Sequence, residues 1–248
     1  MAEYYSLKDL LVARALALDV KEATSLIISG KVLVDEQKID KPGTKIKASS
    51  ILRIKGASTK YVSRAGEKLE GIVKDLDLVR IFNSAIILDV GSSTGGFTDF
   101  SLQNGAKEVY AVDVGTNQIH WKLRNDTRVH VFEKTDIKKF EKPPHVCFDV
   151  IVCDVSFTSI AFILESIKVL ASPTTYLFML IKPQFEADRA DVESGGLITD
   201  ETTRAKIIER TIESIKGQNF EILANRDSSL KGRMGNLESW VVCRLGST

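Results

Sequence analysis

The stretch LDVGSSTGGFTDF, Leu88 to Phe100, decides the fold of this chain. An apolar segment, residues 85–88, leads to a carboxylate at Asp89, and a turn rich in glycine and small hydroxyl residues follows. A buried strand that ends in a glycine-rich turn and then opens a helix is typical of α/β proteins in which the turn lines a ligand site. The stretch therefore predicts a ligand at the carboxyl end of this strand.

Beyond residue 63, apolar segments of strand length alternate with longer helical patterns. We expect strands at Ala85–Val90, Glu108–Asp113, Val129–Glu133, Phe148–Cys153, Thr175–Ile181, Phe220–Asn225 and Ser239–Arg244. We expect helices at Arg64–Val79, Gly96–Asn104, Ile119–Asn125, Phe157–Leu170 and Glu201–Gly217. Strands that alternate with helices indicate a mostly parallel, doubly wound sheet.

The composition is that of an ordinary soluble globular protein, with 44% hydrophobic and 27% charged residues among 248. This length suits one large or two unequal domains. The apolar run Tyr176–Ile181 is far shorter than the roughly 20 residues of a membrane helix, and the N-terminus lacks a signal pattern. We therefore expect a cytoplasmic protein that neither spans nor binds a membrane. Three cysteines in or beside apolar runs indicate reduced thiols and neither a disulfide nor a metal site.

Charge is spread unevenly along the chain. Residues 1–60 hold 11 Lys/Arg and 7 Asp/Glu, a balance of +4, whereas the remainder holds 23 and 26, a balance of −3. A small basic module joined to a mildly acidic body favours binding to a polyanion. The alternative is a chance asymmetry of the solvated surface, which four charges do not exclude.

The basic segment has a pattern of its own. Apolar residues at helical spacing predict helices at about residues 7–18 and 21–29, and residues 32–54 alternate like short strands. The part LIISGKVLVDEQKIDKPGTKI, residues 26–46, resembles an S4 RNA-binding domain, which implies that the helix pair and the following hairpin bind structured RNA. Two positions depart from the usual pattern: Lys8 stands where an acidic residue is common, and Asp35-Glu36 replaces an Asn-Gly turn.

The glycine-rich turn differs from the nucleotide fingerprints. Ser93 occupies the middle glycine position of G-x-G-x-x-G, and no Gly-Lys-Ser/Thr follows. A ligand without a pyrophosphate is favoured, and S-adenosylmethionine fits, because Asp89 can pair with its cationic end and turn amides can meet its carboxylate. The candidate cofactor-binding residues are Asp89, Gly91, Ser92, Ser93, Thr94, Gly95, Gly96, Phe97, Asp113, Asp136 and Asp154.

Two of these carboxylates follow later strands. Asp113, at the end of the second strand, is placed to accept the ribose hydroxyls, and Asp136, after the third, to reach the adenine amino group. The alternative is that such carboxylates merely cap helices.

The fourth strand and the residues after it, FDVIVCDVSFTSI, indicate which kind of atom would accept a methyl group from S-adenosylmethionine. Enzymes that methylate base amino groups generally carry Asn/Asp-Pro-Pro-aromatic here, and this chain has Asp154-Val155-Ser156-Phe157. Carbon methylation of pyrimidines needs a cysteine nucleophile, but strand alternation turns Cys153 to the face opposite Asp154. A hydroxyl acceptor remains.

Several segments together resemble the TlyA-type (haemolysin A) family, in which an S4 domain is fused to an FtsJ-like methyltransferase: LDVGSSTGGFTDF, SRAGEKL, AVDVGTNQIHWKLRND, CDVSFTSI, LIKPQFE and GNLESW. The resemblance implies an α/β fold with a Rossmann-like class I methyltransferase sheet of seven strands, mostly parallel with the last antiparallel. It implies an α+β S4 domain at residues 1–57, a linker at 58–62 and the methyltransferase domain at 63–248. It also implies 2′-O-methylation of ribosomal RNA cytidines, with ribosomal RNA or subunits as partners.

FtsJ-like enzymes use a Lys-Asp-Lys-Glu tetrad, which the resemblance carries onto Lys68, Asp154, Lys182 and Glu238. The placement of Lys182 directly after six apolar residues also favours the edge of a site over an open surface. We hypothesise that Lys182 is a general base, or that it steers the 2′-oxygen as a cation. In either case Asp154 would orient Lys182, and Glu238 would pair with Lys68.

Two loops are predicted to meet RNA, Pro183–Thr199 and Arg226–Asn236, although ordinary flexible connections explain either loop equally well. Two other functions remain open at this point. One is a cytolysin that acts on membranes, and the other is a ribosome-assembly factor that binds RNA without catalysis.

Overall fold

The computed structural model describes residues 4–14, 16–17, 19–35, 37–48, 50–54, 60–193, 195–232 and 234–246. The chain divides into two compact units, residues 1–58 with 233–235, and residues 59–232 with 236–248. The first two positions of the linker predicted at 58–62 lie outside the described residues, as do Glu36 of the predicted turn and Arg233 of the second predicted RNA loop.

The first unit contains the predicted helix pair followed by short strands. Its elements are β1 (Tyr4–Ser6), α1 (Leu7–Ala13), α2 (Val20–Ile28), β2 (Val32–Val34), β3 (Gln37–Lys38), β4 (Lys45–Lys47) and β5 (Leu52–Ile54). Both helices begin at a capping side chain, Ser6 for α1 and Asp19 for α2. Strand β1, which the sequence did not predict, pairs antiparallel with β4, and α1 ends five residues earlier than expected.

The second unit is built on a sheet of seven strands, and this confirms the predicted fold class. The strands are β6 (Ile86–Val90), β7 (Glu108–Val112), β8 (Val129–Phe132), β9 (Val150–Cys153), β10 (Tyr176–Ile181), β11 (Phe220–Asp227) and β12 (Ser239–Leu245). Their order is β11-β12-β10-β9-β6-β7-β8, and β12 runs antiparallel to both of its neighbours while the remaining pairs are parallel.

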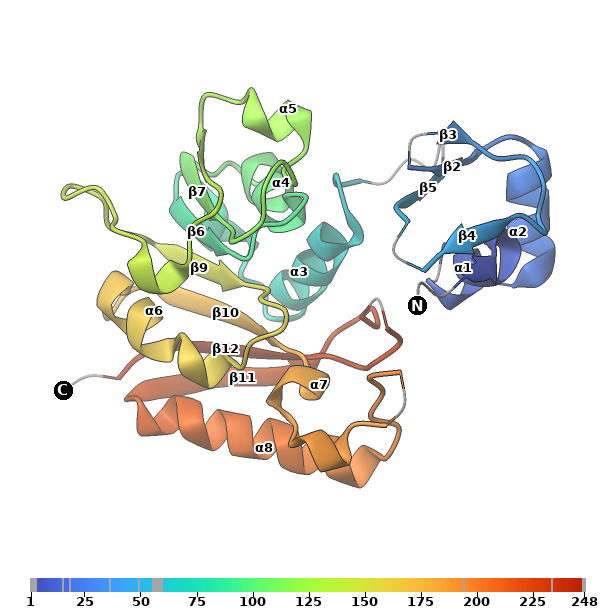
Figure 1. The fold of residues 1–248 in the computed structure, drawn as a ribbon. Helices are drawn as coiled ribbons and strands as arrows, with labels where there is room; N and C mark the ends of the chain where they lie inside the picture. Colours follow the sequence, from blue (N-terminus) through green and yellow to red (C-terminus); the bar gives the residue numbers. More distant parts are fainter. Residues whose placement is uncertain are drawn as a thin grey trace. The chain divides into compact units, whose positions relative to one another are not determined.

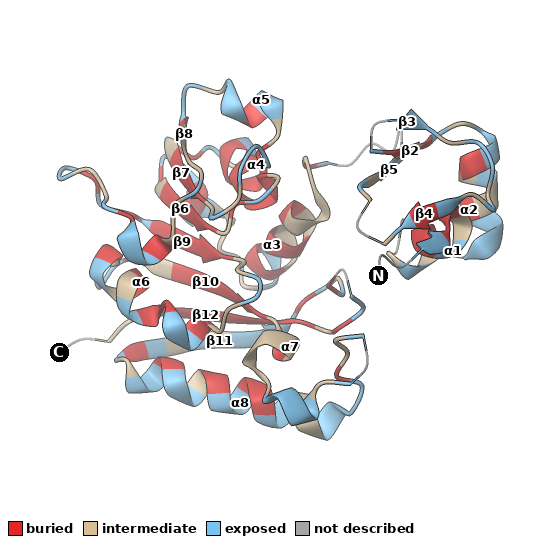
Figure 2. Ribbon diagram, in the orientation of Figure 1, coloured by how far each residue is buried: buried red, intermediate tan, exposed pale blue. Residues whose placement is uncertain are grey.

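Helices cover both faces of this sheet (Figure 1). On one face, α3 (Arg64–Asp75), η1 (Val79–Phe82), α4 (Gly96–Gln103) and α5 (Trp121–Arg124) enclose one apolar core. On the other face, η2 (Ile137–Lys139), η3 (Ile160–Phe162), α6 (Leu164–Leu170) and α8 (Glu201–Gly217) enclose a second. Figure 2 shows that the central strands between these layers are largely buried, whereas the edge strand β11 and one side of α8 are exposed to solvent.

Three helices of the second unit also differ clearly from the prediction. The predicted helix Phe157–Leu170 is broken, because Phe157 has a left-handed φ of 64° and η3 precedes α6. The predicted helix Ile119–Asn125 is reduced to α5, and the helix from Arg64 ends at Asp75 because Asp77 is also left-handed, with φ 54°. Each break lies where the backbone takes a conformation that a helix does not allow.

The chain leaves β6 toward β7 and leaves β9 toward β10, in opposite directions along the sheet. The carboxyl ends of β6 and β9 therefore mark the switch point at which ligands bind in such sheets. Gly91, with φ 81°, follows β6 there, and a Cβ at this position would lie 2.5 Å from the carbonyl oxygen of Asp154. Glycine is thus required where the segments that follow these two strands approach each other.

Across the described residues, no helix has both the length and the apolar character needed to cross a membrane.

Candidate active site

Lys68 and Glu238 form a buried ion pair. Lys68 lies on α3 and Glu238 directly precedes β12, and Lys68 Nζ donates a 2.5 Å hydrogen bond to Glu238 Oε2. The two side chains are only 10% and 3% exposed. Burial raises the pKa of the Glu238 carboxyl, although the Lys68 charge opposes this. Gly232 leaves room for the carboxylate, since a Cβ there would lie 2.2 Å from Glu238 Oε1.

Lys182 and Asp154 form a second ion pair, which is more open. They follow β10 and β9, which are parallel neighbours, so their strand ends meet at one edge of the sheet. Lys182 Nζ lies 2.5 Å from Asp154 Oδ1 in a direction that does not make a hydrogen bond, and it donates one to Ser156 Oγ at 2.8 Å. The side chains of Lys182 and Asp154 are 12% and 17% exposed.

The two pairs lie within electrostatic reach of each other. The Glu238 carboxyl feels the charges of Asp154 and Lys182 in addition to that of Lys68. The structure therefore brings together the four side chains predicted as a tetrad, from three strand ends and one helix. Cys153, next to Asp154, is fully buried in the core on the other side of the sheet, as predicted.

Asp89 is a buried carboxylate at the start of the glycine-rich turn. It lies in β6, has no exposed surface, and accepts a 2.6 Å hydrogen bond from Thr98 Oγ1. Its Oδ1 has no hydrogen-bond partner among the described residues. Burial raises the pKa of Asp89 to about 7, the Thr98 hydroxyl opposes the shift, and the Asp154 charge adds to it. A cation at Oδ1 would satisfy this orphaned oxygen.

The turn itself is held by its backbone. Gly91, Ser93 and Gly95 have positive φ angles of 81°, 46° and 95°. The amides of Gly91 and Ser92 donate to the carbonyl of Val112, the Gly95 amide donates to the carbonyl of Ser92, and the Thr94 carbonyl accepts from His120 N at 3.0 Å. A Cβ on Gly96 would lie 2.3 Å from Ser63 Oγ. The turn is therefore held in one conformation by its own backbone hydrogen bonds and by close packing against Ser63.

Phe97 is placed differently from the rest of the predicted cofactor set. Its side chain is buried and packs against Trp240, with ring centroids 5.6 Å apart. Phe97 therefore contributes to the site only through its backbone amide, which lies in the first turn of helix α4. Its ring belongs to the core.

Asp113 follows β7 and binds the turn. Its Oδ2 accepts from Ser93 N at 2.8 Å and its Oδ1 from Gly115 N at 2.6 Å. Val114, which sequence reasoning missed, is 73% exposed beside it and offers apolar surface at the strand end. In the sequence, the available signal was an apolar residue directly after the acid that ends the strand.

Asp136 caps a turn. It precedes η2, and its Oδ1 accepts a 3.0 Å hydrogen bond from Lys138 N. The capping alternative stated for this residue is therefore realised, and its contact with adenine stays a prediction.

The residues around the turn fit S-adenosylmethionine. They combine an orphaned buried carboxylate oxygen at Asp89, a glycine-rich turn that follows it at the switch point of the sheet, and a half-buried carboxylate at Asp113. Within the part of the chain that the structure describes, no three His, Cys, Asp or Glu side chains gather in a way that could hold a metal ion.

Sequence reasoning also missed residues next to the tetrad. Phe157 is 90% exposed and contacts Phe185, with ring centroids 5.1 Å apart, and Ser156 bonds Lys182. Glu186 accepts hydrogen bonds from Ser159 and Ile160. All lie within the quoted segments CDVSFTSI and LIKPQFE, so their closeness to Asp154 and Lys182 was the available signal.

The two predicted RNA loops are joined to each other. Asn236 is buried, its Oδ1 accepts from Ile198 N at 2.9 Å, and its Nδ2 donates to the Gly196 carbonyl at 2.8 Å. Because Asn236 lies two residues before Glu238, the loop of residues 195–199 is tied to the segment that carries a tetrad carboxylate.

Comparison with known proteins agrees with this geometry. The FtsJ-like methyltransferase family model matches residues 61–245. Hemolysin A of Brachyspira hyodysenteriae is 42% identical over 219 residues, which cover 88% of this chain and 90% of that protein. The 16S/23S rRNA (cytidine-2′-O)-methyltransferase TlyA of Mycobacterium tuberculosis is 34% identical over 237 residues, 94% and 87% of the two chains.

Among solved structures, a protein from Streptococcus thermophilus designated a candidate hemolysin superposes with a TM-score of 0.81 at 32% identity, over 100% of this chain and 90% of that one. The methyltransferase cofactor is S-adenosylmethionine, which the turn of residues 91–96 fits. The chain belongs to the FtsJ-like methyltransferase family, together with the TlyA and hemolysin A proteins.

Proposed function

We propose that this enzyme transfers a methyl group from S-adenosylmethionine to the 2′-hydroxyl of a cytidine in ribosomal RNA. The single observation that carries the proposal is the gathering of Lys68, Asp154, Lys182 and Glu238 at the carboxyl edge of the sheet, near the glycine-rich turn. The similarity to a TlyA protein named as a 16S/23S rRNA (cytidine-2′-O)-methyltransferase supports the choice of nucleotide and RNA.

The four side chains have different roles at the acceptor 2′-hydroxyl. When bound, S-adenosylmethionine supplies an electrophilic methyl group. Lys182 is the group that would hold or remove the proton of the 2′-hydroxyl, because it belongs to the more exposed of the two ion pairs and donates to the exposed Ser156 hydroxyl. Asp154 and Ser156 orient Lys182 from either side, and the buried Lys68–Glu238 pair supports the site from behind. As a neutral amine Lys182 acts as a base, and as an ammonium it fixes the 2′-oxygen.

Phe157 supports an RNA acceptor. Its ring is 90% exposed, rests against Phe185, and lies one residue from the Ser156 hydroxyl that Lys182 binds. Unpaired bases of RNA stack on exposed aromatic rings of this kind. An aromatic face beside the acceptor amine suits a nucleotide that has left its helix.

The first unit is the proposed S4-type RNA-binding domain. Lys21, Lys31, Lys38 and Lys41 are exposed on it, whereas Arg14 donates to the carbonyls of Ala48 and Ser50 and so holds a turn. Exposed lysines on a unit with a surplus of positive charge suit contacts with phosphates. We place the protein in the cytoplasm, with ribosomal subunits as partners.

Methyl transfer to ribosomal RNA tests the proposal. The protein is incubated with labelled S-adenosylmethionine and either unmodified ribosomal subunits or naked ribosomal RNA, and the RNA is digested to nucleosides. The expected product is 2′-O-methylcytidine. A label on a base, or no label on any RNA, contradicts the proposal.

Haemolysis by the purified protein that Lys182→Ala leaves unchanged would favour the cytolysin alternative.

A further inference from the structure

The segments that follow β9 and β10, residues 154–160 and 182–188, are held together at both ends. At the strand end, Lys182 contacts Asp154 and Ser156. At the other end, the Glu186 carboxylate bonds Ser159 and Ile160. The Phe157–Phe185 ring contact lies between the two. These two segments form the acceptor side of the site, and side-chain contacts fasten them to each other at both ends. The contacts of Glu186 are the distal fastening.

Glu186 makes the distal fastening with both of its oxygens. It ends α7 (Pro183–Glu186), its Oε2 accepts from Ser159 Oγ at 2.6 Å, and its Oε1 accepts from Ile160 N at 2.8 Å. Ser159 precedes η3 and Ile160 is buried, so the carboxylate grips a fixed part of the segment. Two charge-assisted hydrogen bonds of normal length make this a strong contact.

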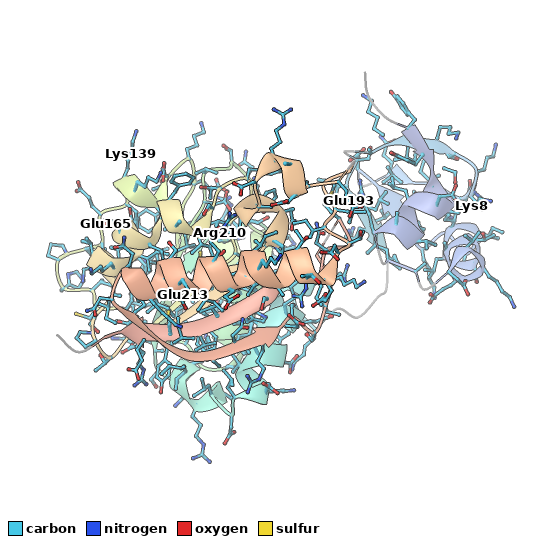
Figure 3. All side chains as sticks on the ribbon, turned by 90° about the horizontal axis from the view of Figure 1, so that it is seen from below. Lys8, Lys139, Glu165, Glu193, Arg210 and Glu213 are labelled. Carbon is cyan, nitrogen blue, oxygen red and sulfur yellow. The ribbon has the colours of Figure 1, made fainter. Side chains whose placement is uncertain are left out.

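Glu186 is itself anchored from behind. Arg210 of α8, labelled in Figure 3, donates to the Glu186 carbonyl at 2.7 Å and to Asp188 Oδ2 at 2.8 Å. The end of α7 is therefore held to the long helix, and the carboxylate transmits that position to the segment after β9.

The residues between the fastenings are not held by burial. Phe157 is 90% exposed with a left-handed φ of 64°, and Ser156 is exposed as well. Their positions depend on the ends of the segment, because few packing contacts surround them. Without the Glu186 contacts, Ser156 and Phe157 would move relative to Lys182. Lys182 would then no longer be aligned with the proton of the 2′-hydroxyl.

We propose that Glu186 is a positioning residue, which holds the segment after β9 against Lys182 so that the acceptor side of the site keeps a single geometry. This rests on the proposed function in that Lys182 acts on the acceptor hydroxyl. Glu186 touches neither substrate nor cofactor, and it acts through Ser159, Ile160 and the segment that they belong to.

Three variants separate positioning from general stability. Glu186→Ala removes both hydrogen bonds, and we expect kcat to fall at least about tenfold while the KM for S-adenosylmethionine stays within about twofold. Glu186→Gln keeps an oxygen for the Ile160 amide and an amide that can donate to Ser159 Oγ, so we expect kcat within about threefold of wild type. Glu165→Ala removes an exposed carboxylate of α6 (Figure 3) and serves as the matched control, with kcat unchanged.

A second measurement does not depend on activity. The Ile160 amide donates to Glu186, so its hydrogen exchange should quicken by at least about tenfold in Glu186→Ala and not in Glu186→Gln or Glu165→Ala.

The outcomes are distinct. A kcat within twofold of wild type in a folded Glu186→Ala protein overturns the proposal, and so does an equal loss in Glu186→Ala and Glu186→Gln. A parallel fall in Tm and cofactor affinity in Glu186→Ala also overturns it, since this would show general destabilisation. If the wild-type protein transfers no methyl group to RNA, the proposed function fails, and unchanged exchange at Ile160 in Glu186→Ala then overturns the fastening independently.

Discussion

At the scale of single residues, the two lysines of the site differ in what surrounds them. The lysines are similarly buried, with side chains 10% and 12% exposed, but the partner of Lys68, Glu238, is 3% exposed, whereas the partner of Lys182, Asp154, is 17% exposed. Lys182 also donates to the exposed Ser156 hydroxyl. A buried charge must keep its partner, but an exposed one can exchange it for a substrate. The environment therefore assigns support to the first pair and contact with the acceptor to the second.

Breaking the buried pair should destabilise the protein. Glu238→Gln leaves the Lys68 ammonium without its counter-charge, and we expect the free energy of unfolding to fall by about 3–5 kcal/mol. The double variant Lys68→Met/Glu238→Leu removes both charges and should lose much less. Urea denaturation measures both, and a loss below about 1 kcal/mol in Glu238→Gln would contradict the account.

Asp89 should make stability depend on pH. Its folded pKa of about 7 lies above an unfolded value near 3.9, so between these values the folded state binds the extra proton. The contribution of Asp89 to the free energy of unfolding of the cofactor-free protein should therefore fall as pH rises from 4 to 7, by about 2–4 kcal/mol in all.

Asp89→Asn tests this dependence. The variant lacks the penalty for a buried charge, so its stability relative to wild type should be greater at pH 8 than at pH 5, as measured by urea denaturation at each pH. Asp191→Asn, at an exposed position, is the control that should show no such difference. Equal relative stability of Asp89→Asn at both pH values would refute the assignment.

At the scale of elements, apolar runs predicted the strands and their order of appearance, because buried parallel strands read as continuous apolar segments. The ends of helices were harder to predict. The segment after the break at Phe157 is bonded through Ser159 and Ile160 to Glu186, far along the chain, and β1 is paired with β4. Such tertiary contacts leave no local pattern.

The same reasoning explains which site residues were found. Lys182 and Asp154 follow apolar strands and were predicted, and the family resemblance supplied Lys68 and Glu238, which lie 170 residues apart. Glu186 and Asn236 were missed as contacts, because each side chain bonds a segment far from it in the sequence.

Asn236 should couple its two loops. Asn236→Ala removes the hydrogen bonds to Ile198 and Gly196 and leaves the buried Ile198 amide and the partly buried Gly196 carbonyl without these partners. We expect a loss of about 1–3 kcal/mol in the free energy of unfolding and faster hydrogen exchange at Ile198. Asn125→Ala, at an exposed position, is the control, and unchanged exchange at Ile198 would show that the loops are not joined in solution.

At the scale of the whole molecule, two units with separate cores divide the positive charge unequally. The first has its own apolar core and a surplus of lysine, and the second contains the tetrad. This division predicts that the basic unit contributes to RNA affinity and the second unit to the chemical step.

Neutralising the basic unit should weaken RNA binding without slowing the chemistry. For the triple variant Lys21→Ala/Lys31→Ala/Lys41→Ala, we expect a higher KM for RNA and an unchanged kcat. The slope of log K for RNA binding against log salt concentration should become shallower by up to about 2–3, which corresponds to three lost phosphate contacts. Alanines at Lys168, Lys206 and Lys216 remove the same charge from the second unit as a control. An equal effect of both triple variants would contradict the division of roles.

The most direct test of the central claim is labelled methyl transfer to ribosomal RNA by Lys182→Ala. We expect kcat to fall at least about a hundredfold in a protein that still folds and still binds S-adenosylmethionine, because Lys182 acts on the acceptor hydroxyl and not on the cofactor. Lys216→Ala, which loses only an exposed ion pair with Glu213, should transfer methyl groups at the wild-type rate. Full transfer by a folded Lys182→Ala protein would contradict the claim.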